Sequence, residues 1–271
     1  MSVRRLLGSG SHVAGRLGAF VLVLAGAFGT AYAVGERLPG HSHGSVGHTN
    51  EQHGAPGPAA QGFESGGYQL VTDHVMPGVA TFHLRADDGT TVTRFTQAHG
   101  ALLHVVLVRP DLSGFQHVHP EIRNDGTWDV TLTEPGQWHV VFDSTPDGAS
   151  DPVVVSANLD DETQIATVPL PPADDTVDID GLHIVRDGFT FTVTNADGGA
   201  PTGLEPYLGQ PAHLVAMRVG DLAYTHLHPS GDMAGMYTFG AGITAPGTYR
   251  LFLQFGHAGQ VLTVPFTVVV P

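Results

Sequence analysis

Two short phrases of the sequence, "QHVHP" and "THLHP", each place two histidines one residue apart and directly before a proline. His104 precedes His117 by 13 residues, and His213 precedes His226 by the same 13 residues. The chain therefore carries two matching histidine trios, which are His104, His117 and His119, and His213, His226 and His228.

Neutral imidazole is a good ligand for divalent copper, zinc and nickel, and copper stands at the top of the divalent affinity series. Three imidazoles can surround a zinc-like ion with nitrogens about 2.0–2.1 Å from the metal. The trios therefore predict a transition-metal site, copper first and zinc second, either one in each repeat or one shared between them. The alternative is that the histidines are structural and only bond backbone carbonyls.

These trios need strands to position them. Residues i and i+2 of a strand lie on one face, so the two histidines of each phrase project together if the phrase is extended, a conformation that the following proline favours. His104 lies in "LLHVVLV", a strand-like run. The other runs rich in valine and aromatic residues, with turn signals between them, span 79–86, 101–108, 127–133, 137–143, 151–159, 181–185, 189–195, 212–219, 236–242, 248–255 and 262–270.

The chain also repeats itself downstream of each trio, where "EPGQWHVVFD" aligns with "APGTYRLFLQ". This duplication predicts an all-β protein of two tandem immunoglobulin-like or cupredoxin-like β-sandwich domains, at residues 68–168 and 176–271. His99 or His257 could add a fourth ligand from a loop, and Met233 and Met236 could add thioether sulfur for Cu(I).

The phrase "LLHVVLVRPDLSGFQHVHPEIRNDGTWDVTLTEPGQWHVVFD" and its second copy, "AHLVAMRVGDLAYTHLHP" with "APGTYRLFLQF", resemble a group of uncharacterised secreted or membrane-anchored bacterial proteins. That group is similar to the YtkA/FixH-like class of small extracytoplasmic β-sandwich domains, some of which are called heavy-metal-binding or copper-associated. The resemblance covers about residues 68 to 271, and it implies a β-sandwich fold with the six histidines as pattern positions.

The N-terminus indicates the compartment. Arginines precede an uncharged run at 17–35, which is either an export signal cleaved after Ala33 or an uncleaved helical anchor. Residues 1–35 thus form the signal peptide or signal-anchor, and both readings place the rest of the chain outside the cytoplasm. Residues 36–67 are a flexible linker rich in Gly, Pro and His, with histidines at 41, 43, 48 and 53 that could collect metal ions weakly.

Composition limits the remaining functions. The chain has 11 basic and 26 acidic residues, so its surface repels nucleic acid and favours cations. Cysteine is absent, which excludes disulfides and thiolate sites. Catalytic elbow, zinc-protease and phosphate-loop motifs are absent too, so we expect no enzyme. The sequence predicts an extracytoplasmic metal-binding protein for buffering, resistance or delivery to a metal-transport partner. The alternative is a non-catalytic scaffold or adhesion-like module.

Overall fold

The computed structural model describes residues 64–98, 100–160, 163–230, 235–240 and 242–271. All regular elements in these ranges are β-strands, and they form two tandem units, as the sequence predicts. The predicted hydrophobic helix at 17–35 and the histidine-rich linker up to residue 63 lie outside the described residues. Among the described residues, no helix is long and apolar enough to span a membrane.

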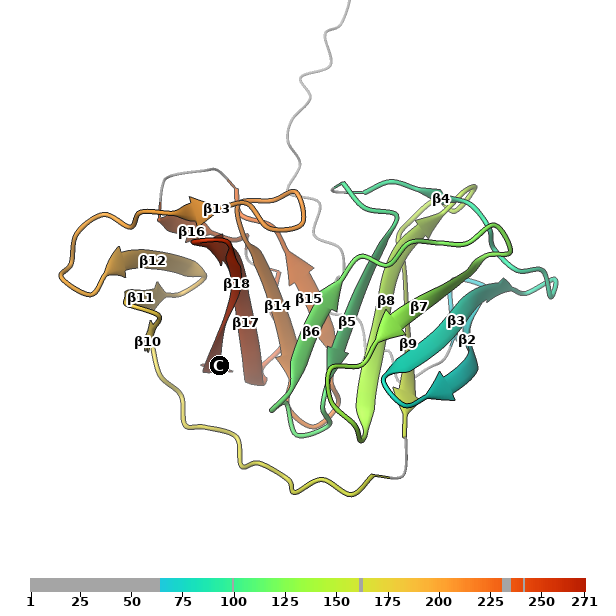
Figure 1. Ribbon diagram of the computed structural model, residues 1–271, viewed down its shortest axis with the longest axis horizontal. Coiled ribbons are helices and arrows are strands. Elements are labelled where there is room, and N and C mark those ends of the chain that lie inside the picture. The colour runs from blue at the N-terminus through green and yellow to red at the C-terminus, as the bar shows by residue number, and fades with distance from the viewer. Residues whose placement is uncertain (1–63, 99, 161–162, 231–234, 241) are drawn as a thin grey trace, which may run out of the picture. The chain divides into compact units, whose positions relative to one another are not determined.

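The first repeat comprises β1 to β9. Its strands are β1 (Glu64–Ser65), β2 (Tyr68–Met76), β3 (Val79–Ala86), β4 (Phe95–Thr96), β5 (Leu103–Val108), β6 (Phe115–Val118), β7 (Thr127–Thr131), β8 (Trp138–Pro146) and β9 (Val153–Leu159). One sheet has the order β1-β2-β3-β7, and the other has the order β4-β8-β5-β6 with β9 also paired to β8. Figure 1 shows the two sheets facing each other as a sandwich.

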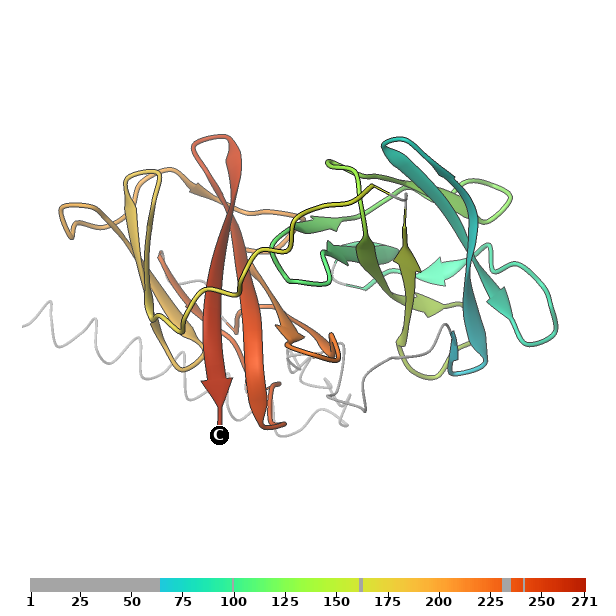
Figure 2. The ribbon, with the colours of Figure 1, turned by 90° about the horizontal axis from the view of Figure 1, so that it is seen from below.

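The second repeat has the same topology. Its strands are β10 (Thr176–Ile179), β11 (Leu182–Asp187), β12 (Thr190–Asn195), β13 (Leu204–Glu205), β14 (His213–Arg218), β15 (Tyr224–Leu227), β16 (Met236–Thr238), β17 (Gly247–His257) and β18 (Gln260–Val270). One sheet has the order β10-β11-β12-β16, and the other has the order β13-β17-β14-β15 with β18 paired to β17. The long β17–β18 hairpin is visible in Figure 2.

Each sandwich has its own apolar core between its sheets. Trp128, Phe82 and Phe142 lie at the centre of the first core, while Phe191 and Phe266 lie in the second. Phe82 and Phe142 meet edge to face with ring centroids 4.9 Å apart, a favoured aromatic geometry. The alternating valines and aromatics thus supply one inward face for each sheet.

Turns with positive φ values recur in both repeats, at the start of β8 and β17 and inside the two histidine hairpins. The Pro-Gly glycines Gly136 and Gly247 have φ values of 111° and 150°, a region that suits glycine because it has no Cβ. A Cβ on Gly136 would lie 2.0 Å from the Ile165 side chain. In the β5–β6 and β14–β15 hairpins, Leu112 and Leu222 both adopt a left-handed φ, at 63° and 56°. The two hairpins share their register through equivalent backbone bonds, from Arg109 N–H to the Gly114 carbonyl and from Arg218 N–H to the Ala223 carbonyl.

The sequence pattern missed some strands. No run was expected between residues 68 and 78, yet β2 lies there, and β10 precedes the first expected strand of the second repeat. In β2 only Leu70 is buried, and its last five residues are exposed. A strand with so little buried surface has no apolar alternation to detect.

Candidate metal centre

The strands that carry the first histidine of each trio are buried on both faces. Every residue of β5 is buried. Leu103, Val105 and Leu107 pack into the core of the first repeat, whereas Val106 and Val108 pack in a separate cluster. Because strand residues alternate, His104 shares the face of Val106 and Val108.

That separate cluster joins the two repeats. It contains Val106, Val108, Leu112 and Val141 from the first repeat with Val215, Met217, Tyr224 and Phe252 from the second. The Phe115 and Phe252 rings stack across it with centroids 4.1 Å apart. Both repeats belong to the compact unit that extends to Pro271. The histidine trios therefore lie on the faces through which the repeats meet.

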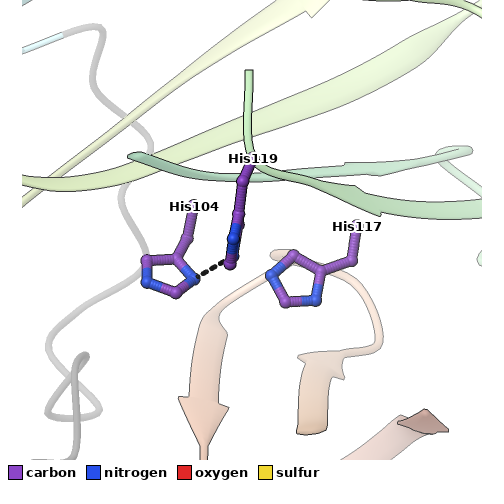
Figure 3. A group of neighbouring side chains, drawn as sticks. All are labelled: His104, His117 and His119. Carbon is purple, nitrogen blue, oxygen red and sulfur yellow. Dashed lines mark hydrogen bonds between the residues drawn. The ribbon is translucent and has the colours of Figure 1, made fainter. Parts of the chain in front are cut away.

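The first trio is assembled by the β5–β6 hairpin. β5 and β6 pair antiparallel with Val106 opposite His117 and Val105 opposite Val118. Continuing this register places His104 opposite His119. Figure 3 shows the three rings converging, with His119 Nε2 2.9 Å from His104 Nδ1.

The second trio repeats this arrangement in the β14–β15 hairpin, where Val215 is opposite His226. His226 Nε2 lies 3.0 Å and His228 Nε2 3.1 Å from His213 Nδ1. Two ligand nitrogens on a tetrahedral zinc-like ion would stand about 3.3 Å apart, from metal–nitrogen distances of about 2.0–2.1 Å. Two nitrogen pairs of this trio, His213–His226 and His213–His228, are thus already near the spacing that an ion requires.

Backbone carbonyls fix how the first histidine of each trio points. His213 Nε2 lies 2.8 Å from the Tyr207 carbonyl, and His104 Nε2 lies 3.4 Å from the Ala98 carbonyl. A carbonyl only accepts, so Nε2 carries the ring proton and Nδ1 keeps its lone pair toward the cluster. Such an outer hydrogen bond is the usual means of orienting a metal-binding imidazole.

His117 is oriented from the other repeat. Its Nδ1 lies 3.2 Å from Oε1 of Gln254 on β17, and the Tyr207 hydroxyl donates to its backbone carbonyl at 3.0 Å. Because the amide oxygen accepts the proton on Nδ1, Nε2 keeps a lone pair. This Nε2 is buried and has no hydrogen-bond partner, and the same is true of His226 Nδ1. A buried polar atom left unpaired costs about 1–3 kcal/mol, so a bound cation would offset a real penalty at His117.

The two trios meet around an approximate two-fold relation. The His104–His226 and His117–His213 ring centroids are both 4.9 Å apart. His104–His228 and His119–His213 are 6.1 and 6.4 Å apart. His117 and His226 are equivalent positions that the two-fold relation exchanges, and their ring centroids are 4.7 Å apart.

Burial favours the neutral form of three histidines of the cluster. Burial and then the neighbouring imidazoles lower the pKa of His117 well below 6.5, and the same causes act on His226. For the partly exposed His119, burial and then His213 lower the pKa to about 4. Neutral imidazole is the form that binds metals, so His117, His119 and His226 are ready as ligands at neutral pH.

Among the residues that the structure describes, two sets of three nitrogens lie close enough to hold an ion, each within 4.8 Å of one another. They are His104, His117 and His119, and His117, His213 and His226. The first set is the predicted trio, and the second combines both repeats. His228 joins the cluster through its contact with His213.

Other predicted contributors lie elsewhere or outside the described residues. His257 ends β17 and pairs with Gln260 across the hairpin. Met236 is exposed in β16, which belongs to the opposite sheet of the second sandwich from the histidines. His99 and Met233 lie outside the described residues.

Sequence reasoning missed Gln254, Tyr207 and a buried carboxyl, Asp143. Burial raises the pKa of Asp143 to about 7, although a hydrogen bond from the Tyr224 hydroxyl at 3.4 Å opposes the shift. Asp143 and Gln254 end the aligned phrases "EPGQWHVVFD" and "APGTYRLFLQ". A polar residue at the same place in both apolar strands was the available signal.

The fold and the cluster define a duplicated all-β protein whose two sandwiches share a buried group of histidines able to hold a metal ion. The model of the family described as "Domain of unknown function (DUF8832)" matches residues 65–159 and again residues 180–271. The chain belongs to this family and carries its domain twice. A comparison with curated proteins finds no match.

Proposed function

We propose that this protein binds a transition-metal ion, copper in the first place and zinc in the second, in its buried histidine cluster. The observation that carries the proposal is the convergence of imidazoles from duplicated positions into nitrogen groups no wider than 4.8 Å. Low pKa values at His117 and His226 add to it, because they keep these rings neutral. An all-imidazole set favours copper among the divalent ions.

The biological role that fits this chemistry is buffering, resistance or delivery to a metal-transport partner, without catalysis. The resemblance to YtkA/FixH-like domains supports copper and a place outside the cytoplasm. The arginine-led apolar run at 17–35 supports attachment through an N-terminal helix or export by a cleaved signal.

The test is a titration of the full chain with Cu(II) and with Zn(II). Because the linker could bind metal by itself, its four histidines (His41, His43, His48 and His53) are first replaced by serine. We expect binding below micromolar Kd that weakens at least 100-fold in the His117→Ala/His119→Ala variant. His183→Ala is the matched control, since this ring lies on β11 with Asp178 as its partner at 2.6 Å.

The rival function is a scaffold or adhesion-like module with structural histidines. Carbonyl bonds at His104 and His213 fit that reading too. It predicts no tight binding by the linker-substituted chain, together with a lower melting temperature in the double variant. That combination would overturn the metal proposal.

A further inference from the structure

We infer that the cluster holds one metal ion shared between the repeats, and not one ion in each repeat. This inference rests on the proposed function and specifies its stoichiometry and ligands. The ion would be held by His117 of the first repeat with His213 and His226 of the second.

The argument begins with His117, which belongs to both nitrogen groups. Its Nδ1 is engaged by Gln254, so only Nε2 can ligate. One lone pair binds one ion. Both groups need His117 as their third ligand. They therefore cannot both hold a three-coordinate ion at the same time.

Three observations favour the group that joins the repeats. All three of its rings are buried, whereas His119 in the other group is partly exposed. His117 Nε2 is already without a hydrogen-bond partner. Its ring also lies within 4.9 Å of both His213 and His226, by centroids.

The spacing of the rings agrees with a single central ion. For a metal–nitrogen distance of about 2.0–2.1 Å and a ring radius of about 1.1 Å, imidazole centroids around a tetrahedral ion stand about 5 Å apart. In the group that joins the repeats the centroid distances are 4.7, 4.9 and 5.3 Å. His104, at 4.9 Å from His226 by centroids, is the counterpart of His213 under the two-fold relation.

The protonation states need little change. His213 Nδ1 already has a lone pair, because the Tyr207 carbonyl holds the proton on Nε2. His226 Nε2 at 3.0 Å and His228 Nε2 at 3.1 Å both face that single lone pair as donors. Moving the His226 proton from Nε2 to Nδ1 turns this donor into a ligand while the ring stays neutral, and no proton is released.

The experiment counts ions in the full chain with the linker histidines replaced. Native mass spectrometry with Zn(II) and spin counting with Cu(II) give the stoichiometry without altering the cluster. We expect one ion per chain and a Cu(II) signal without dipolar broadening. Two ions inside the cluster would be close enough to couple, and a half-field signal with two ions per chain would overturn the inference while leaving metal binding intact.

Substitutions in each repeat add a second readout. His117→Ala and His213→Ala should each weaken the same single ion at least 100-fold, with His139→Ala and His183→Ala as matched controls in the two repeats. Circular dichroism checks that each variant is folded. If His213→Ala leaves the ion in place, the site belongs to one repeat and the inference fails. If the unsubstituted cluster binds no ion at all, the proposed function fails with it.

Discussion

Acid should destabilise the metal-free protein, because the histidine cluster is folded in its neutral form. His117, His119 and His226 have pKa values lowered from 6.5 by burial. Below pH 6.5 the unfolded chain binds protons at these rings and the folded chain does not. Stability from these groups is therefore complete above pH 6.5 and is lost as the pH falls toward the folded pKa values.

The magnitude follows from about 1.4 kcal/mol for each pH unit. Between pH 7 and pH 5, His117 and His226 each remove up to about 2 kcal/mol, and the partly exposed His119 about 1 kcal/mol after allowance for solvent screening. Asp143 acts in the opposite direction, since its pKa is raised to about 7 and the folded state binds its proton more tightly. It returns about 2 kcal/mol over the same range, so these four groups give a net loss of about 3 kcal/mol. His139, whose pKa is also lowered by burial, adds to this loss.

The assay is urea unfolding at pH 7 and pH 5 with a chelator present, followed by circular dichroism and by tryptophan fluorescence. Both tryptophans, Trp128 and Trp138, are buried in the first repeat, so agreement of the two probes shows that the repeats unfold together. In Asp143→Asn the opposing contribution is gone, and the loss should grow to about 5 kcal/mol. Asp187→Asn, an exposed change on β11, is the control. A free energy of unfolding that is flat or higher at pH 5, or an Asp143→Asn slope equal to that of the control, would refute the reasoning.

Three further predictions concern the site and the core. Metal binding near pH 7 should release almost no protons, because burial keeps the ligands His117 and His226 neutral, and calorimetry in two buffers of different ionisation enthalpy should give the same heat. Gln254→Leu should weaken metal binding about 10- to 100-fold by removing the acceptor that orients His117, with far-UV circular dichroism unchanged. Trp128→Ala should destabilise the fold by about 3–5 kcal/mol in urea unfolding, because this fully buried ring fills the first core.

The sequence was sufficient for the fold class and for the pairing within each trio. Strand alternation and the 13-residue spacing predict that His104 and His117 come from neighbouring strands, and β5 and β6 do pair. The glycines of the Pro-Gly phrases mark equivalent turns in both repeats. These features are local in the chain, so a repeated pattern reveals them.

The meeting of the two trios could not be derived in the same way. It depends on contacts such as His117 with Gln254, which are separated by 137 residues. A partial signal existed, because "LLHVVLV" and "HLVAMRV" are continuous apolar runs and not alternating ones, which is typical of strands buried on both faces. The apolar runs predict that a second layer of the protein covers β5. They do not predict that this layer is the other repeat.

The duplication is what creates the chemistry of this site. In a single repeat, the face that carries His104, Val106 and Val108 would be open to water. Packing against the second repeat buries that face. It lowers the pKa of His117 and leaves its Nε2 buried without a partner. One histidine hairpin is thus only half of the proposed centre, and an ion bound there would stabilise the contact between the repeats by mass action.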